Sequence, residues 1–212
     1  MLERVEVRLM KVHLNHFHFF IKKMFGTIFK KPTDEQRLVL CAQKGDMRAA
    51  RHIYDENARY LSAICSRYIQ NDEDVRDVMQ ESFIRIFTAI DSFQYRGDGS
   101  LRGWMSRIVL NESLKFLKQK SRLSFCELET DNFNVVDEVP TNDIPTEIIY
   151  QAIRELPDGY RTVFNLYVVE NKSHKEIAEL LGIKADTSAS QLHRAKAMLC
   201  KKLKKYKLDN SL

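Results

Sequence analysis

Two short helical patterns that meet at a glycine near the C-terminus constrain the fold of this chain more than any other feature. Ser173 is followed three residues later by Glu176, the spacing of a capping box in which each side chain satisfies a backbone N–H of the other residue. We therefore expect a helix that begins at Ser173 and ends at Gly182, where glycine adopts a left-handed backbone at low cost. A second helix is predicted to begin at Asp186 or Thr187, both good N-caps. Its predicted buried stripe comprises Leu192, Ala195, Leu199 and Leu203. Such a pair of helices is typical of a helix-turn-helix motif.

The charge of this motif favours DNA as its partner. Residues 172–207 carry ten Lys or Arg and three acids. The N-terminal half of a helix fits the major groove, where short polar side chains and Arg reach base edges and nearby cations hold phosphates. Opposite the buried stripe lie Ser190, His193, Arg194, Ala197 and Lys201. An ordinary solvated helix face is the alternative explanation of the same charges.

Composition predicts the fold class. The 212 residues are enough for two small domains, and a hydrophobic content of 44% is enough for packed cores. Gly and Pro are few, at seven and four residues, and helical periodicities recur while strand-like alternation is rare, so we expect an all-α fold. The four cysteines lie far apart without a Cys-x-x-Cys pair, which indicates neither a zinc site nor a disulfide framework. A reducing cytoplasm fits this cysteine usage best.

The N-terminal 32 residues differ from the rest of the chain. They hold seven Lys or Arg, two Glu and an aromatic and histidine-rich run at residues 13–20. No apolar stretch here reaches the roughly 18 residues of a membrane-spanning helix, and no small-residue cleavage site marks a signal peptide. His13, His16 and His18 have no fourth ligand in view, so a surface tail is favoured over a metal site. We expect a basic extension outside the folded domains, either disordered or, if translation starts at Met24, an artefact of the assigned start.

Residues 33–122 are predicted to form four helices. The first, second and fourth are expected to span about 34–44, 46–69 and 101–120. The third is the most clearly marked, because Asn71 caps it and three acids follow in its first turn, where the helix dipole favours anions. Its apolar stripe, which must be core or interface, comprises Val75, Val78, Met79, Ser82, Phe83, Ile86, Phe87 and Ile90.

The fourth predicted helix carries a second basic face. Its members are spaced by three or four residues and so share one side of the helix. They are Arg107, Asn111, Lys115, Lys118 and Arg122. Such a face can follow a phosphate backbone. The preceding loop, residues 91–100, offers Phe93, Tyr95 and Arg96 as stacking surfaces and a cation. Unpaired bases need such surfaces, since stacking is worth roughly 1–3 kcal/mol per base. The alternative is that the two aromatic rings plug the end of the helical bundle.

An acidic segment separates this block from the C-terminal one. Residues 127–147 hold seven acids and no Lys or Arg, and Pro140 and Pro145 break any long helix. We expect a flexible linker whose charge keeps it solvated and away from the basic surfaces. Mimicry of DNA phosphate, which would be autoinhibitory, is the alternative. The predicted organisation is an extension at 1–32, a helical domain at 33–122, a linker at 123–146 and a helix-turn-helix domain at 147–212.

From Asp34 to Tyr206 the arrangement resembles the bacterial RNA polymerase sigma factors of the sigma-70 class, in the extracytoplasmic-function (ECF) group. The run Asp77-Val-Met-Gln80-Glu81-Ser-Phe83 resembles the motif of the family's region 2 that binds core polymerase. Residues 93–111 are similar to the part of region 2 that captures and melts the minus-ten promoter element. Residues 156–164 and the helix-turn-helix are similar to region 4, which contacts the minus-35 element.

The resemblance implies three groups of site residues. Contacts with core polymerase are implied at Asp74, Asp77, Gln80, Glu81 and Phe83. Minus-ten contacts are implied at Phe93, Tyr95, Arg96, Gly97, Arg107, Asn111, Lys115 and Lys118. Minus-35 contacts are implied at Thr187, Ser188, Ser190, Gln191, His193, Arg194 and Lys196. Ala189 stands where many relatives have Lys or Arg, so their minus-35 preference does not transfer to this chain.

The resemblance also implies partners. We expect a promoter-specificity subunit that is not an enzyme, acts in the cytoplasm without cofactor or metal, and works with core RNA polymerase, promoter DNA and an anti-sigma factor. Neither a small-molecule substrate nor membrane insertion is expected. The alternative is a helix-turn-helix transcriptional regulator with an N-terminal sensing or dimerisation domain, which the motif at 77–83 and the aromatic loop oppose. An enzyme is a third alternative, for which no Gly-rich phosphate loop, paired metal ligands or Ser/His/Asp set stands out.

Overall fold

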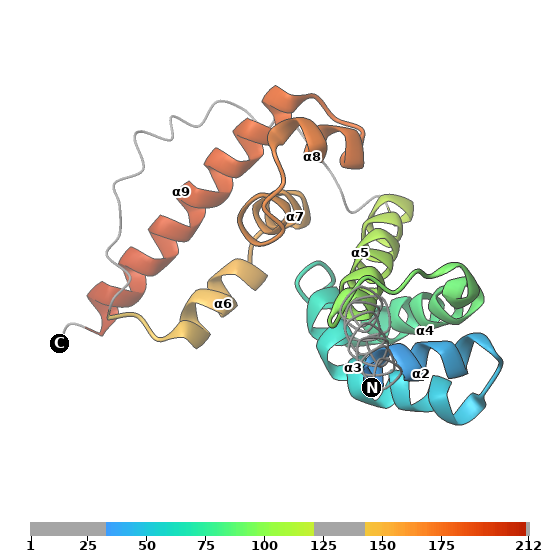
Figure 1. Cartoon of the computed structure of the whole chain (residues 1–212). Coiled ribbons are helices and arrows are strands. Elements are labelled where there is room, and N and C mark those ends of the chain that lie inside the picture. Colours follow the sequence, from blue (N-terminus) through green and yellow to red (C-terminus); the bar gives the residue numbers. More distant parts are fainter. Residues whose placement is uncertain (1–32, 121–142, 211–212) are drawn as a thin grey trace, which may run out of the picture.

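The computed structural model describes residues 33–120 and 143–210. All regular elements within these ranges are helices, and they form two helical domains (Figure 1), so the predicted all-α fold is confirmed. None of the described helices has the length and apolar character needed to cross a bilayer. The predicted N-terminal extension, most of the predicted linker and Arg122 lie outside the described residues.

The N-terminal domain is built from helices that begin where the sequence supplies a cap. Its elements are α2 (Asp34–Gln43), α3 (Met47–Cys65), α4 (Asp72–Ala89), the short 3-10 helix η1 (Ile90–Ser92) and α5 (Ser100–Gln119). Thr33, Asp46 and Asn71 precede α2, α3 and α4, and the side chain of each accepts a hydrogen bond from a backbone N–H of the first turn. The predicted cap at Asn71 and the acidic first turn after it are confirmed.

The second helix ends earlier than predicted, at Cys65 and not at Ile69. The chain turns through residues 66–70 instead, and both Tyr68 and Ile69 become buried, with exposed fractions of 0% and 1%. Both side chains belong to the apolar cluster of the N-terminal domain. The turn also brings two backbone carbonyls to the surface that meets the C-terminal domain.

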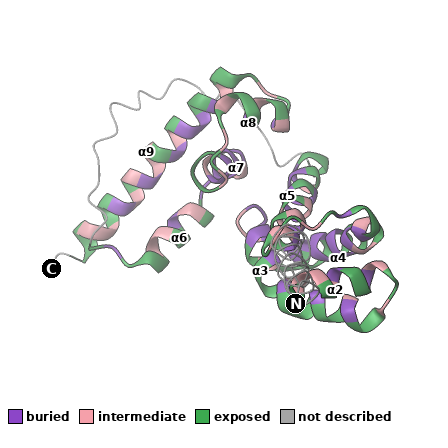
Figure 2. Ribbon diagram, viewed as in Figure 1, coloured by how far each residue is buried: buried purple, intermediate pink, exposed green. Residues whose placement is uncertain are grey.

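The core of the N-terminal domain lies between α3, α4 and α5, whose inward faces are buried (Figure 2). The predicted stripe on α4 is confirmed with one exception, because Phe87 is only half-buried. Its buried members are Val75, Val78, Met79, Ser82, Phe83, Ile86 and Ile90. They face Leu61 and Ile64 of α3 and Met105 and Val109 of α5 in one apolar cluster.

The C-terminal domain contains the predicted helix-turn-helix. Its elements are α6 (Thr146–Arg154), α7 (Asp158–Phe164), the π-helical turn η2 (Asn165–Val169), α8 (His174–Leu181) and α9 (Ala185–Asp209). The capping box between Ser173 and Glu176 is present, and Gly182 ends α8 with a φ of 72°. The predicted start of the second helix is wrong, because α9 begins at Ala185 after an extended Lys184 and places Asp186 inside its first turn. An acid there is favoured by the helix dipole even without a side-chain cap.

The two domains share part of one core. The predicted buried stripe of α9 divides between two clusters: Ala195, Leu199 and Leu203 pack with α6 and the start of α7, whereas Leu192 joins the cluster of the N-terminal domain. The other C-terminal members of that shared cluster are Val163, Leu166, Ile177 and Leu181. The helix-turn-helix is therefore packed against the N-terminal domain and is not an independent appendage.

Candidate nucleic-acid interface

The basic face of α5 is exposed along its length. Arg107, Asn111, Lys115 and Lys118 are all exposed, as their spacing predicts. The Lys115 ammonium lies 3.6 Å from the Glu112 carboxylate, and the Lys118 ammonium donates a hydrogen bond of 2.8 Å to the carbonyl of Leu180 in α8. The last residue of this face in the described part of α5 is therefore held by the other domain.

The loop before α5 combines a buried ring with exposed polar groups. Phe93 is 9% exposed and packs against Trp104, with ring centroids 5.0 Å apart. Phe93 thus plugs the end of the bundle, which was the alternative to its predicted role in stacking on a base. Arg96 is exposed, and Gly97 has a φ of 123°, a conformation that favours glycine. The loop therefore exposes the Arg96 guanidinium, and the packing of Phe93 on Trp104 anchors its backbone.

Tyr95 is held in place by hydrogen bonds and is not free to swing. Its hydroxyl lies 2.6 Å from the Thr33 hydroxyl and donates to the Asp98 carboxylate at 2.5 Å. The hydrogen bond with Asp98 raises the pKa of the Tyr95 phenol, and the same bond lowers the pKa of the Asp98 carboxyl. The half-buried ring of Tyr95 keeps a fixed position at the edge of the loop.

A surface hollow connects the loop with the basic face of α5. It is lined by Ser92, Phe93, Gln94, Arg96, Ser100, Gly103, Trp104 and Arg107. Two guanidinium groups and the half-buried edge of Trp104 therefore surround one depression, and Gly103 contributes no side chain to fill it. Aromatic surface beside cations suits an unstacked base and its phosphate. Trp104 therefore has two roles, because it packs on Phe93 and also forms a wall of this hollow.

The outer edge of α4 carries a second candidate surface. Asp77, Gln80 and Glu81 are exposed on neighbouring turns, and Ile84, the next residue on that face, is 54% exposed. Beside them runs a groove that includes Tyr54, Met79 and Phe83. An exposed aliphatic side chain framed by acids fits a partner that offers both apolar and basic groups.

Two residues grouped with this edge by sequence face elsewhere. Asp74 is 8% exposed, and its carboxylate lies 2.6 Å from the Lys120 ammonium at the end of α5. Phe83 is 7% exposed and packs on Tyr54 with ring centroids 4.5 Å apart. Both side chains shape the domain, so direct contact with a partner through Asp74 or Phe83 does not fit their positions.

The first half of α9 sorts the predicted minus-35 residues into two sets. Ser190, His193 and Lys196 are exposed, and Thr187 and Arg194 are half-buried. Two others face inward. Ser188 is fully buried, with its hydroxyl 3.0 Å from Nδ1 of His174, and Gln191 is 1% exposed. Helical periodicity of apolar residues does not reveal polar side chains that face inward, such as these two.

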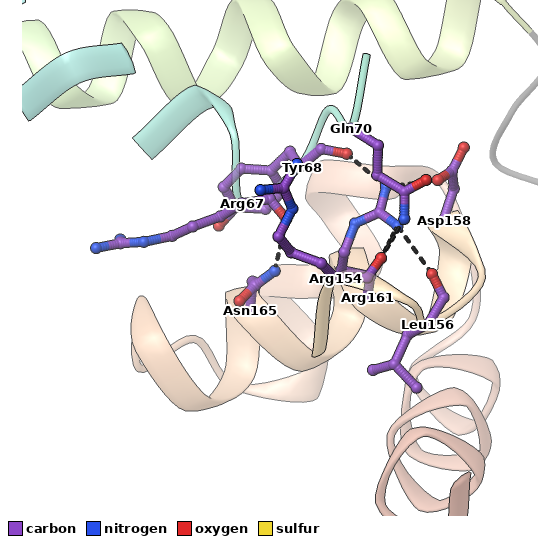
Figure 3. Close-up of polar contacts among 8 residues, drawn as sticks. All are labelled: Arg67, Tyr68, Gln70, Arg154, Leu156, Asp158, Arg161 and Asn165. Carbon is purple, nitrogen blue, oxygen red and sulfur yellow. Dashed lines mark hydrogen bonds and ion pairs between the residues drawn. The ribbon is translucent and has the colours of Figure 1, made fainter. Parts of the chain in front are cut away.

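The interface between the domains is polar at its centre, and we call it the docking seam. It joins Arg67, Tyr68 and Gln70, in the turn before α4, to Arg154, Arg161 and Asn165 of the C-terminal domain (Figure 3). Glu170 of the same domain also belongs to it, through an ion pair with Arg67. No sequence motif predicts it, because its hydrogen bonds join residues 84 to 98 positions apart.

Arg161 is the centre of the docking seam and is only 1% exposed. Its guanidinium donates to the Tyr68 carbonyl at 2.8 Å and, within its own domain, to the carbonyls of Leu156 and Arg154 at 2.8 and 3.1 Å. It also pairs with the Asp158 carboxylate. Burial lowers the pKa of the Arg161 guanidinium, and the charge of Asp158 opposes this shift. The ion pair with Asp158 therefore offsets part of the cost of burying the Arg161 charge. The charged guanidinium can then donate to the Tyr68 carbonyl of the other domain.

The rest of the docking seam lies around this cation. The Asn165 amide donates to the Arg67 carbonyl at 2.9 Å, and the Arg67 guanidinium lies 3.6 Å from the Glu170 carboxylate. The Gln70 side chain donates to the Arg154 carbonyl. Asn165 is 3% exposed, whereas the Arg67–Glu170 pair is partly solvated.

Comparison with known proteins identifies the two domains. Residues 53–123 match the family model for Sigma-70 region 2, and residues 146–199 match that for Sigma-70, region 4. The two domains therefore define a protein of the sigma-70 class.

Similarity over nearly the whole length of several relatives gives the narrower group. The ECF RNA polymerase sigma-E factors of Salmonella typhimurium and Escherichia coli are each 30% identical over 182 residues, which cover 80% of this chain and 94% of theirs. The sigma-E factor of Haemophilus influenzae is 27% identical over 80% of this chain and 95% of its own. A solved structure of CnrH in complex with the cytosolic domain of CnrY is 24% identical, with a TM-score of 0.42 over 79% of this chain and 95% of that one. The chain belongs to the ECF RNA polymerase sigma factors, and it serves RNA polymerase in promoter recognition.

Proposed function

We propose that this sigma factor binds core polymerase through the outer edge of α4, with Asp77, Gln80 and Glu81 as the polar contacts and Ile84 as the apolar one. The observation that carries the proposal is the exposure of these four side chains together on a helix whose other face is core. Asp74 and Phe83 support this edge from inside. The same edge argues against a plain helix-turn-helix regulator, which would not need it.

The minus-ten element is proposed to bind the hollow before α5 and the basic face of α5. A flipped base would enter beside Trp104 and Arg96, while Arg107, Asn111 and Lys115 would follow the strand. Stacking and phosphate contacts would supply the energy of strand opening, and no catalytic group is required. Tyr95 is proposed to set the edge of the loop, and Phe93 to support it from below.

The minus-35 element is proposed to bind the exposed part of α9. Ser190, His193 and Arg194 are the candidates for base contacts, and Lys196 for a phosphate. Ser188 and Gln191 would orient the helix on α8 and not touch DNA. The exposed methyl of Ala189 offers no hydrogen bond at its position.

The domain bounds, the cellular location and a further protein partner complete the proposal. We take the functional units to be region 2 at 33–122, a linker at 123–146 and region 4 at 147–212, acting in the cytoplasm without enzymatic activity. An anti-sigma factor is proposed to compete with core polymerase for the α4 edge. Ile84→Arg should then weaken both partners together in competition binding, whereas loss of only one would separate the two surfaces.

Run-off transcription with purified core polymerase and promoter fragments tests the assignment. Glu81→Lys should abolish core binding and specific initiation. Glu56→Lys is a matched control, because both glutamates are exposed helical residues that pair with a side chain four residues away, Glu81 with Arg85 and Glu56 with His52. Equal activity of the two variants would contradict the α4 assignment, and absence of specific initiation by the wild-type chain would contradict the promoter role.

A further inference from the structure

We propose that Arg85 of α4 and Glu112 of α5 are positioning residues that connect the binding of core polymerase at Glu81 to the binding of DNA by Lys115. In the free chain they hold Lys115 back from DNA, and contact of polymerase with Glu81 releases it. The inference rests on the proposed function for the roles of Glu81 and Lys115. Its physical basis is a series of three ion pairs that runs from the outer edge of α4 to the basic face of α5.

The series of ion pairs begins on α4. One atom of Arg85, the guanidinium Nε, lies 3.5 Å from the Glu81 carboxylate and 2.9 Å from the Glu112 carboxylate. Glu81 precedes Arg85 by one helical turn on the exposed face of α4, whereas Glu112 belongs to α5, which packs against α4. Because Nε carries a single hydrogen, the two carboxylates compete for it. A partner that pairs with Glu81 therefore leaves this hydrogen to Glu112.

Glu112 divides its two oxygens between two cations. Its Oε1 faces Arg85, and its Oε2 lies 3.6 Å from the Lys115 ammonium, one turn further along α5. Glu112 is only 7% exposed. A buried carboxylate that loses its cations is strongly destabilising, because neither water nor a partner then compensates its charge. At least one of the two cations must therefore stay beside Glu112.

Lys115 is the cation that can change partner. Its side chain is about half exposed, and a lysine ammonium on its flexible stem can turn from a carboxylate to a nearby phosphate. The move is favourable only if Arg85 compensates the charge of Glu112 in its place. The strength of the pair between Arg85 and Glu112 therefore sets how readily Lys115 binds DNA.

Polymerase binding changes the strength of that pair. In the free chain Arg85 is shared between Glu81 and Glu112, so Glu112 also retains Lys115. When a basic group of polymerase pairs with Glu81, Arg85 pairs with Glu112 alone and Lys115 is released. The coupling is reciprocal, so DNA that takes Lys115 should also favour polymerase at Glu81. We expect a coupling of about fivefold, at the low end of the usual range, because the side chains other than Glu112 are half solvated.

Binding of a single-stranded minus-ten oligonucleotide tests the proposal, measured with the free chain and with the holoenzyme. Lys115→Ala should weaken binding about fivefold in the holoenzyme and by less than about twofold in the free chain. Glu112→Gln keeps the shape of the side chain but removes its charge, so in this background Lys115→Ala should cost the free chain as much as the holoenzyme. Arg85→Gln should weaken holoenzyme binding about as much as Lys115→Ala, because Glu112 then retains Lys115.

The affinity for core polymerase without DNA gives a second measurement, in which the two positioning residues should act with opposite signs. Glu112→Gln should weaken core binding by about threefold or less, the effect of one solvated ion pair, because Arg85 then pairs with Glu81 alone. Arg85→Gln should strengthen core binding, because it leaves Glu81 unpaired. A purely structural role would weaken core binding in both variants. Arg85→Lys, which retains the charge, should restore the wild-type behaviour.

Arg51→Gln is the matched control. Arg51 also pairs with an acid four residues away on an exposed helix face, Asp55 at 3.6 Å, and among the described residues no ion pair joins it to α5. It should leave both affinities unchanged. Equal effects of Lys115→Ala in the free chain and the holoenzyme, or weaker core binding in both Arg85→Gln and Glu112→Gln, would overturn the inference but not the proposed function. No effect of Lys115→Ala in either form would contradict the proposed DNA face of α5, and the inference with it.

Discussion

The carboxylate of Glu35, in the first turn of α2, accepts a hydrogen bond of 2.8 Å from the backbone N–H of Gly99, directly before α5. Its second oxygen accepts from the N–H of Leu101 at 3.1 Å. No side chain of the loop itself caps α5, so a residue from another helix satisfies its first turn. The proposed minus-ten loop is thereby tied to the start of the domain.

Glu35→Ala should destabilise the chain by about 1–2 kcal/mol, the range for loss of a helix cap or of hydrogen bonds to a charged group. Urea unfolding at pH 7 measures this. Asp34→Ala is the control, because its carboxylate is fully exposed and forms a 3.4 Å surface pair with Arg37, and such surface changes usually stay within about 0.5 kcal/mol. Similar losses in both variants would mean that the hydrogen bond between Gly99 and Glu35 contributes nothing to the free energy of unfolding.

The buried hydroxyl of Tyr68 gives a prediction of opposite sign. Among the described residues this hydroxyl has no hydrogen-bond partner, and burial raises the pKa of the phenol. Tyr68→Phe should therefore leave the free energy of unfolding unchanged or raise it by up to about 1 kcal/mol. The backbone carbonyl that receives Arg161 remains in the variant. A clear loss of stability in urea unfolding would show that the hydroxyl is bonded in solution.

The capping box of α8 predicts a pH dependence. Hydrogen bonds from Ser173, first from its backbone N–H, lower the pKa of Glu176 below 4.5. A depressed folded-state pKa contributes stability that is present above the unfolded value and is lost as the pH falls through the folded value. The melting temperature of Glu176→Gln should be lower than that of the wild type at pH 7, and the gap should close below pH 4.5. Glu179→Gln, an exposed change on the same helix, should show no such gap.

Features that depend on neighbouring residues, such as helix caps, could be predicted from the sequence. Contacts between residues far apart in the sequence could not. Asn71, Ser173 and Gly182 act within four residues of their own helix ends, so their roles follow from spacing alone. The bonds of Glu35 to α5 and of Arg161 to Tyr68 join residues 64 to 93 positions apart. A sequence pattern has no means of pairing such residues.

The same limit applies to the candidate site. The basic face of α5 followed from helical periodicity, because every member shares one side. The motifs place Phe93, Ser188 and Gln191 among the DNA contacts, yet all three are buried. Phe93 packs on Trp104, and the Ser188 hydroxyl lies beside His174 of α8. Whether a ring or an amide faces outward is decided by the element packed against it, which the motif does not contain.

Trp104 is the single tryptophan of the chain and should report minus-ten binding directly. It is half-buried and lines the hollow proposed for an unpaired base, so a stacked base should quench or shift its emission. Titration of the holoenzyme is complicated by polymerase tryptophans, so the free chain and a single-stranded minus-ten oligonucleotide are used. Arg96→Ala should weaken the response about tenfold or less, as loss of one cation near the base would. An unchanged emission at saturating oligonucleotide would place the base elsewhere.

Replacement of Arg194 and of Lys118 by alanine should change promoter binding in different ways. Arg194 lies on the half of α9 proposed to enter the major groove, where a bidentate contact with a guanine is worth about 1–3 kcal/mol of discrimination. Arg194→Ala should therefore flatten the preference among minus-35 variants in holoenzyme binding. Lys118 is proposed to hold a phosphate, so Lys118→Ala should weaken all promoters alike and reduce the slope of log affinity against log salt by about 1. Binding measured on a set of single-base minus-35 substitutions, at two or more salt concentrations, separates the two effects. Equal losses on every promoter for both variants would mean that Arg194 contacts the backbone, and that base recognition by α9 rests on Ser190 and His193.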